Sequence, residues 1–348
     1  MTGQLLFRQF RIWDGKRFGF GDVLVKDGCI AAIGEDLSAQ ADIVFEGNGG
    51  ILSAGLVDIH THIKHLSDDR YGMPPESAAF PFGVTAAVDA TGCGKDGAYM
   101  DLLPLDAGVW VEIPIRENRP MLEYAQRRIQ RYGKYAVGYK VYFAEGMGSV
   151  DARPLGEIFS VVDRPVMVHV TGSPVPMAEY LPLFRKGDVL THPFHGGRYT
   201  AAKDDFSVLQ QAKERGVVID LGMAGHVHTD LMILKAAADR GIFPDTISTD
   251  ATIGSLNRRG GRYGLTLCMS VMRYMGMPEE EIMAAVTTRA AQAVSRPWGQ
   301  LAVGKPADLA VLDWDESGAS GFAYDAACNS HGYACRMTVK NGTIVYRR

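Results

Sequence analysis

Short apolar segments alternate with helix-like segments through the middle of this chain, and this alternation limits the possible folds more than any other feature. The apolar segments are nearly continuous, which is typical of parallel strands covered on both faces. Most are followed by helix-like stretches that end at a glycine, a common residue after the last helical turn. The pattern predicts an α/β fold, and its eight apolar segments predict a (β/α)8 TIM barrel. These segments are residues 56–60, 84–90, 107–113, 135–143, 164–170, 188–194, 216–222 and 245–252.

An open, doubly wound α/β sheet is the alternative that the same alternation allows. A sheet of that kind usually binds a nucleotide phosphate at a glycine-rich turn after its first strand. Here the first apolar segment runs instead into the sequence HTHIKH at residues 60–65, which contains no glycine. We therefore favour the closed barrel.

The two ends of the chain share a second pattern. Residues 1–50 and 297–348 contain short runs of alternating apolar and polar residues, broken by Asp-Gly pairs and by Asn-Gly at 341–342. These are signals of antiparallel hairpins with tight turns. Because the two β-rich segments enclose the barrel pattern, we expect one small β-sandwich domain built from both termini. The barrel then occupies residues 51–296.

Charge and composition narrow the class of partner. The chain has 348 residues and a formal net charge of −4 with interspersed signs, which gives no reason to expect a nucleic acid or a membrane surface. No apolar stretch approaches the roughly 20 residues of a membrane-spanning helix, and the first residues do not resemble a secretory signal. Five scattered cysteines indicate reduced thiols. We expect a cytoplasmic protein with a small-molecule substrate, and the sequence is compatible with a homo-oligomer.

A pair of histidines closes the first apolar segment. His60 and His62 are two residues apart, so on a strand both imidazoles point to the same side and can bind one metal ion. A lone histidine at a strand end is more often a hydrogen-bonded structural residue. The pair alone therefore supports only a metal-site hypothesis.

Four further polar residues fall in later strands of the predicted barrel. The carboxyl ends of barrel strands meet at one mouth, so residues far apart in sequence can meet there. Each has a structural explanation, such as a solvent-reaching lysine stem or an aspartate that caps the next helix. Together with the histidine pair, however, six buried polar groups would carry a heavy desolvation cost unless they were paired or coordinated. The four residues are Lys140, His169, His192 and Asp250.

Metal-dependent hydrolysis gives a role to all six side chains. Four imidazoles can bind two divalent cations, and a buried neutral lysine can take up CO₂ to form a carbamate that bridges them. Two such ions lower the pKa of a bridging water and supply a hydroxide near neutral pH. Asp250 can bind one ion, accept the proton as general base and pass it to the leaving group as general acid. We therefore expect hydrolysis of an amide, a cyclic amide or a carboxylic ester.

Six segments resemble the amidohydrolase superfamily: GLVDIHTH, VGYK, PVMVHV, DVLTH, DTISTDAT and GQLAVGKPADLAVLD. The resemblance covers nearly the whole chain and points to the dihydroorotase-like members and to bacterial deacetylases of acetylated amino acids or hydroxy acids. It implies a binuclear centre with a carboxylated Lys140 and with Zn²⁺ as the expected metal. The implied metal ligands are His60, His62, Lys140, His169, His192 and Asp250.

Three positions near the expected barrel mouth depart from that deacetylase pattern. Tyr142 stands where an arginine is usual, His195 stands where an asparagine is usual, and the string Gly222-Met223-Ala224 replaces Gly-His-Gly. The metal-ligand pattern itself is intact. The resemblance therefore implies the same reaction on a different substrate, and the missing arginine argues against small acylated acids.

Other polar residues near the mouth are candidates for substrate binding. Lys64 stands where dihydroorotases, which read HxHxR, carry an arginine, although a lysine cannot form the same two-pronged contact. His226 and His228 share the HxH spacing, and we interpret them as substrate contacts or as support for ligands, not as a third metal site. For the loop arginines, a solvated surface charge is the simpler explanation. The loop arginines are Arg198, Arg258, Arg259 and Arg262, and the full substrate-binding set is Lys64, Tyr142, His195, Arg198, His226 and His228.

Cys93 offers a second candidate for the bridging ligand. Its context, DATGCG, resembles the metal-bridging cysteine of N-acyl-D-amino-acid deacylases, which lack the lysine. Because Lys140 lies in the better-matched segment, we favour the lysine. A thiolate near zinc is also a plausible extra ligand, and a buried cysteine acting as a small apolar residue explains Cys93 at least as well.

Two other functions remain open on the sequence. A mononuclear deaminase of a nucleobase would need one metal and a carboxylate after His169, where the nearest acid is Glu179. A non-catalytic scaffold with the same fold would be expected to lose metal ligands, and all six are present here. The binuclear hydrolase is therefore our leading hypothesis.

Overall fold

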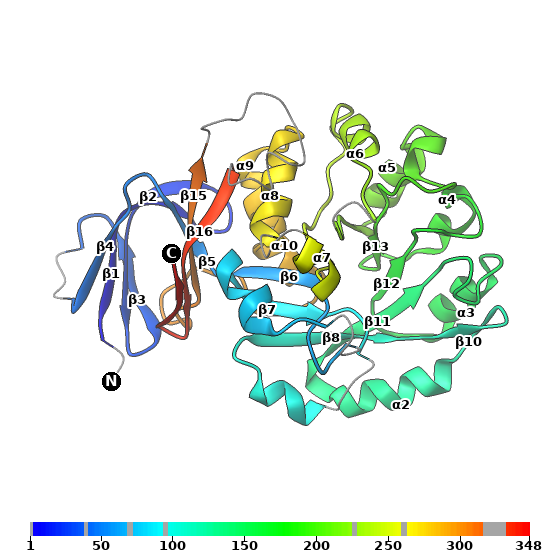
Figure 1. The fold of residues 1–348 in the computed structure, drawn as a ribbon, viewed down its shortest axis with the longest axis horizontal. Coiled ribbons are helices and arrows are strands. Elements are labelled where there is room, and N and C mark those ends of the chain that lie inside the picture. The colour runs from blue at the N-terminus through cyan, green and yellow to red at the C-terminus, as the bar shows by residue number, and fades with distance from the viewer. Residues whose placement is uncertain are drawn as a thin grey trace.

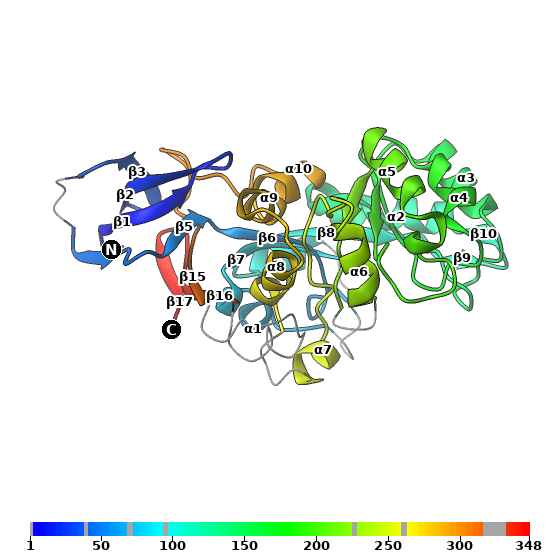
Figure 2. The same cartoon turned by 90° about the horizontal axis from the view of Figure 1, so that it is seen from above.

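The computed structural model contains a barrel and a small β domain beside it (Figure 1, Figure 2). It describes residues 3–37, 41–67, 72–92, 97–224, 228–258, 263–315 and 332–348. Strand β5 (Ile51–Ala54) of the small domain leads through Gly55 directly into β6 (Leu56–Thr61), the first strand of the barrel.

Seven parallel strands form most of the barrel wall. Each pairs with its neighbour in chain order, as expected for a sheet built from repeated strand–helix units. Nearly every residue of these strands is buried, in agreement with their continuous apolar sequences. The strands are β6, β7 (Val84–Asp89), β8 (Asp106–Glu112), β11 (Ala136–Tyr142), β12 (Val166–His169), β13 (Val189–Thr191) and β14 (Val218–Asp220).

The eighth predicted strand closes the barrel without forming a regular strand. Residues 246–251 make isolated parallel bridges to β14, at Asp220 with Thr246, and to β6, at Thr61 with Ala251. On the β6 side, the Asp250 backbone N–H donates to the carbonyl of His60 at 2.6 Å. Asp250 has a φ of 49°, in the left-handed region, which interrupts regular strand geometry. The predicted eight-unit barrel is confirmed.

Helices cover the barrel at the positions that the sequence pattern predicts. Helix α2 (Leu122–Tyr132) ends at Gly133, and α6 (Leu231–Ala238) begins after Asp230, whose side chain accepts hydrogen bonds from two backbone amides of the first turn. None of the helices in the described ranges is both long enough and apolar enough to cross a membrane. The other helices are α1 (Pro75–Ala78), α3 (Arg153–Val161), α4 (Met177–Tyr180), α5 (Ser207–Glu214), α7 (Ile253–Arg258), α8 (Leu265–Tyr274), α9 (Glu279–Ala285) and α10 (Thr288–Ala293), and β9 (Ile115–Arg116) pairs with β10 (Arg119–Pro120).

The small domain combines strands from both ends of the chain. Its sheet order is β17-β16-β15-β5-β1-β2-β3, with β4 paired to the first part of β1. The strands enclose a hydrophobic cluster of their own, which includes Phe7, Val23, Leu309 and Val339. This is the two-ended β domain that the sequence predicts. Its strands are β1 (Leu5–Trp13), β2 (Phe18–Lys26), β3 (Cys29–Gly34), β4 (Ile43–Glu46), β5, β15 (Leu309–Asp315), β16 (Gly332–Lys340) and β17 (Thr343–Arg347).

Polar contacts join the small domain to the barrel. Lys340 of β16 is buried, and its Nζ donates to Asp308 at 2.7 Å and to Asp106 of β8 at 3.1 Å. Trp13 of β1 donates from its indole nitrogen to the hydroxyl of Thr287 at 3.1 Å. These partners satisfy polar groups that would otherwise be buried without a hydrogen bond.

The connection at Gly55 leaves no space for a side chain. A Cβ atom there would lie 2.0 Å from Oγ1 and 2.4 Å from Cγ2 of Thr85, a buried residue of β7. We expect Gly55→Ala to lower the free energy of unfolding by about 1–3 kcal/mol, because the branched side chain of Thr85 would be forced from its position. Urea unfolding of the two proteins measures the difference.

Gly156→Ala is the matched control for Gly55→Ala. Gly156 lies within α3, and a Cβ there meets no atom within 4 Å. Alanine in a helix is favoured over glycine by roughly 0.5–1 kcal/mol, so this variant should be as stable as the parent or slightly more stable. Equal stability of both variants would show that the Gly55 connection is not sterically limited.

Candidate metal centre and active site

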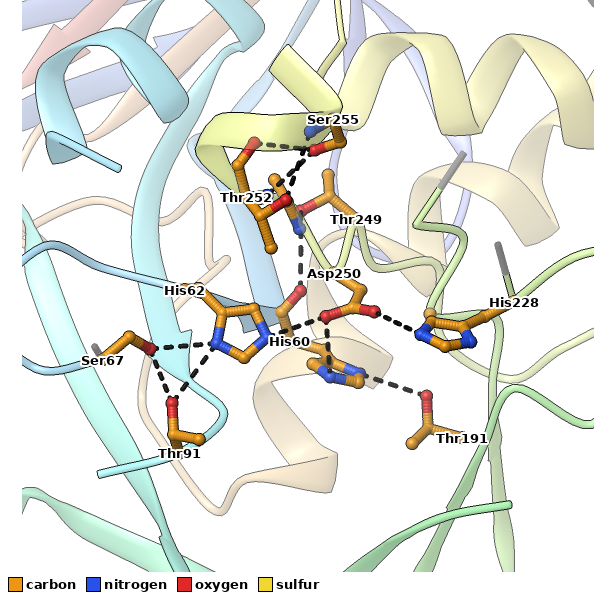
Figure 3. A network of polar contacts seen from close by, with 12 residues as sticks. His60, His62, Ser67, Thr91, Thr191, His228, Thr249, Asp250, Thr252 and Ser255 are labelled. Carbon is orange, nitrogen blue, oxygen red and sulfur yellow. Dashed lines mark hydrogen bonds and ion pairs between the residues drawn. The ribbon is translucent and has the colours of Figure 1, made fainter. Parts of the chain in front are cut away.

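The predicted histidines, Lys140 and Asp250 meet at the carboxyl ends of the barrel strands. His60 and His62 come from the end of β6, and Asp250 comes from the segment that closes the barrel. Four of the six side chains line a cavity of about 330 Å³, a size that suits a small ligand. Figure 3 shows Asp250 between His60 and His62 on one side and His228 on the other.

One group of donors consists of His60, His62 and Asp250. Oδ1 of Asp250 lies 2.9 Å from Nε2 of His62 and 3.3 Å from Nε2 of His60. Their candidate ligand atoms all lie within 4.8 Å of one another, close enough to surround a single ion. All three side chains are buried, where such groups need a common partner.

A second group contains His169, His192 and His228. Their ring centroids are 4.3 to 4.8 Å apart, and their candidate ligand atoms also lie within 4.8 Å of one another. Oδ2 of Asp250 lies 3.8 Å from Nε2 of His192 and 3.7 Å from Nε2 of His228. Nε2 of His192 is buried and has no hydrogen-bond partner within the described part of the chain. A buried nitrogen without a partner, facing other donors, fits a metal ligand.

Asp250 lies between the two groups, with one carboxylate oxygen toward each. Burial by itself raises the pKa of this carboxyl group, but the electrostatic interactions with His60 and His62 and the hydrogen bond with His62 outweigh that effect. The net result is a pKa well below the ordinary range of an aspartate, so the side chain is ionised near neutral pH. An anion in this position can serve cations on both sides.

Lys140 lies at the centre of β11 and is fully buried. Its Nζ is 3.1 Å from Nε2 of His60. Burial lowers the pKa of the amine to about 8, although Asp250 and Asp220 partly oppose the shift. A larger share of this amine is therefore neutral near pH 7 than of an exposed lysine, and the neutral form is the one that can react with CO₂.

Burial favours the neutral, metal-binding form of three imidazoles, those of His60, His169 and His192. Burial lowers the pKa of His169 and of His192 well below the usual value, and the neighbouring His228 adds to the shift. The pKa of His60 is also lowered, by burial first and then by the charge of Lys140. A neutral imidazole keeps one lone pair available for a cation.

Hydrogen bonds determine which nitrogen of His60 and His62 faces the other donors. Thr191 donates its hydroxyl proton to Asp220 at 2.8 Å, so its oxygen is left to accept from Nδ1 of His60 at 3.1 Å. In the same way Ser67 donates to Asp89 and accepts from Nδ1 of His62, at 2.6 and 2.9 Å. In both rings Nε2 is then the nitrogen that faces Asp250.

The two histidines of the second group are oriented by backbone carbonyls. Nδ1 of His192 donates to the carbonyl of Gly222 at 2.6 Å, which leaves Nε2 as its free donor atom. Nε2 of His169 donates to the carbonyl of Thr171 at 3.2 Å, which leaves Nδ1. In all four histidines of the predicted ligand set, one ring nitrogen is therefore held by a hydroxyl group or a backbone carbonyl, which orients the other nitrogen.

Two residues of this site have a strained backbone. His192 and Asp250 have φ values of 66° and 49°, in the left-handed region that non-glycine residues rarely occupy. Each such residue costs on the order of 1–3 kcal/mol and persists only where its surroundings hold it. An alternative role for Asp250, as the cap of α7, is wrong. Thr252 caps that helix instead, by accepting from the Ser255 amide at 3.2 Å (Figure 3).

The candidate substrate-binding residues lie at different places. Tyr142 lines the cavity, with its ring 5.4 Å from that of His169. His228 also lines it, but belongs to the second donor group. His195 is buried outside the cavity lining, and Lys64 and Arg198 are exposed outside it. His226, Cys93, Arg259, Arg262 and the side chain of Arg258 lie outside the described residues.

Sequence reasoning missed the carboxylates that support the site. Asp220 accepts hydrogen bonds from three hydroxyl groups, and Asp89 accepts from Ser67 and from backbone amides. Glu112, at the end of β8, lines the cavity and was also missed. All three end or nearly end apolar segments, where a single carboxylate is a signal that could have identified them.

Comparison with known proteins agrees with this arrangement. Residues 191–345 match the pattern of the amidohydrolase family. A deacetylase of Brucella anthropi is 31% identical over 84% of this chain and 79% of its own length. A deacetylase of Agrobacterium fabrum is 30% identical over 86% of this chain and 81% of its own length.

A solved structure shares the fold over almost the full length. The crystal structure of a dihydroorotase superposes with a TM-score of 0.82 at 24% sequence identity, and the match covers 98% of both chains. The two sequence relatives place the chain in the amidohydrolase superfamily, beside these deacetylases, as a hydrolase that shares its fold with the dihydroorotase.

Proposed function

We propose that this chain is a binuclear metal-dependent hydrolase of an amide, a cyclic amide or a carboxylic ester. The observation that carries the proposal is the pair of donor groups on either side of Asp250, His60 with His62 and His169 with His192. Two adjacent sets of oriented lone pairs fit two divalent cations, and the mixture of imidazole and carboxylate donors suits Zn²⁺.

The buried lysine supports the binuclear form of the proposal. Lys140 approaches His60 from β11, and as a carbamate it would supply a carboxylate to both ions. His228 is close enough to His169 and His192 to be a further donor to the second ion. We therefore propose His228, a candidate substrate contact on the sequence, as a ligand of this ion.

The residues of the chain account for the proton transfers of the reaction. When bound, the two cations would polarise the carbonyl group of the substrate and lower the pKa of a water molecule. Asp250 is ionised, so its carboxylate can accept a proton from the attacking water. It can then return that proton to the leaving nitrogen or oxygen, so that an amide and water yield a carboxylic acid and an amine. Tyr142 and Thr252 form part of the cavity wall around these groups.

The two other functions have less support. A mononuclear deaminase would need a catalytic carboxylate after His169, but Glu179 is exposed on α4 and does not line the cavity. A scaffold without activity has no need for buried, oriented imidazoles, which cost free energy to maintain. The chain should therefore be tested first as a hydrolase.

Metal analysis and a substrate screen test the proposal directly. We expect about two divalent ions per chain, and removal of the ions by a chelator should abolish hydrolysis until metal is restored. The screen should contain N-acyl amino acids, acyl hydroxy acids, cyclic amides and lactones. A single ion per chain together with ammonia release from nucleobases would instead support the deaminase.

Substitution of Lys140 tests the carbamate. Lys140→Ala should lose one of two ions and lower activity by at least about 100-fold, beyond the loss typical for residues that only support a ligand. A short carboxylic acid such as propionate should restore both, because it can fill the space of the missing carboxylate. Lys64→Ala removes an exposed lysine that follows β6 and does not line the cavity, and it serves as the control. If Lys140→Ala kept two ions and full activity, the carbamate assignment would be wrong.

Substitution of His228 tests the composition of the second donor group. His228→Ala should weaken binding of one ion by at least about 10-fold, while the other ion stays bound with the parental affinity. Titration of the metal-free proteins with Zn²⁺ measures both affinities. His195→Ala removes a nearby histidine that is outside both donor groups, and it should leave both affinities unchanged. Parental affinities in His228→Ala would restrict His228 to contact with substrate.

A further inference from the structure

Glu112 is the charged side chain of the cavity that the proposed reaction does not use. It is the last residue of β8 and lies in register with Lys140 on the neighbouring strand β11. Its backbone N–H donates to the carbonyl of Thr91 at 3.3 Å, and the next amide, of Ile113, donates to the carbonyl of Lys140 at 2.8 Å. Bonds on both sides hold this backbone in place at the edge of the cavity that Glu112 lines.

The Glu112 carboxylate has no partner of its own within the described part of the chain. Neither a hydrogen bond nor an ion pair reaches it, and it belongs to neither donor group. Burial raises its pKa, while Arg128 and Lys140 partly oppose that shift. A carboxylate that is largely removed from water and lacks a hydrogen-bond donor is stabilised by a ligand that brings one.

The rest of the described cavity wall contains no Lys or Arg side chain. Apart from the donor groups, it consists of hydroxyl side chains and one thioether, from Thr91, Tyr142, Met147 and Thr252. The described cations Lys64 and Arg198 are exposed outside the lining. A substrate carboxylate placed against this wall would meet the like charge of Glu112, and neither Arg128 nor Lys140 is among the described residues that line the cavity.

We propose that Glu112 selects substrates that carry a primary amine or another cationic hydrogen-bond donor beside the scissile bond, and that it disfavours those that carry a carboxylate there. The inference rests on the proposed function, since the scissile bond is the one placed at the two donor groups. Adjacent strands are about 4.8 Å apart, so the recognised amine is separated from the scissile carbonyl by a short chain of a few atoms. N-acylated short diamines have this chemistry.

Three acetamides of equal length test the selectivity. One ends in an ammonium group, one in a neutral methyl group and one in a carboxylate, and kcat/KM is measured for each with the metal-loaded protein. The parent should prefer the ammonium compound to the carboxylate compound by about 10–100-fold, the range expected for a hydrogen bond to a charged group. Glu112→Gln should reduce this preference to roughly 3-fold or less by the loss of that interaction.

Glu145→Gln is the matched control. Glu145 follows β11, is exposed and does not line the cavity, so its neutral variant should keep the parental preference. The metal content of Glu112→Gln should equal that of the parent. Loss of an ion from this variant would overturn the inference, because the carboxylate would then be a metal ligand.

Binding of the same three compounds separates this inference from the proposed function. If the parent hydrolyses none of the three compounds, the proposed reaction is contradicted. Calorimetric measurement of their binding affinities still tests the role of Glu112. Tighter binding of the ammonium compound by the parent, lost in Glu112→Gln and kept in Glu145→Gln, would support the inference. Equal binding of all three compounds, binding of none, or a preference for the carboxylate would overturn it.

Discussion

The position of the Asp250 carboxylate is the constraint on which the rest of the site depends. One of its oxygens faces His60 and His62, and the other faces His192 and His228. The same residue joins the closing segment of the barrel to β6 through its backbone amide. Closure of the barrel and assembly of the donor groups are therefore one structural event. The left-handed backbone of Asp250 is tolerated because neighbours on both sides hold it.

A layer of hydrogen bonds beneath the donors makes their geometry a property of the fold. Asp220 and Asp89 act through Thr191 and Ser67 to hold the rings of His60 and His62, and backbone carbonyls hold His169 and His192. Because one nitrogen of each ring is already engaged, the other faces the centre before any ligand arrives. Such preparation lowers the cost of ordering the site when a ligand binds.

At the barrel mouth, the residues that would carry out the reaction are not the residues that would select the substrate. Tyr142 and Glu112 lie at the ends of β11 and β8, beside Lys140 but outside the donor groups. Tyr142 stands where the resembling deacetylases usually carry an arginine, and Glu112 adds a negative charge to the same wall. The donor groups can thus stay the same while a few residues at strand ends change which substrate charge the cavity wall favours.

Much of this arrangement was readable from the sequence. Periodicity and composition are local properties, so they determined the eight strand–helix units, the two-ended β domain and the order of His60, His62, Lys140, His169, His192 and Asp250 along the strands. Their approach followed from the general geometry of a barrel mouth. The resemblance to amidohydrolases rested on these same segments.

Only the tertiary structure decided which side chains outside those segments join the site. It brought His228 against His169 and His192, turned Glu112 to the cavity and placed Asp220 beneath His60, and it left Lys64 and Arg198 in solvent. It also made Thr252, not Asp250, the cap of α7. Sequence spacing describes neighbours along one element, whereas these contacts join residues far apart in the chain. Their positions depend on how the strands close around the barrel and on where each loop returns to its mouth.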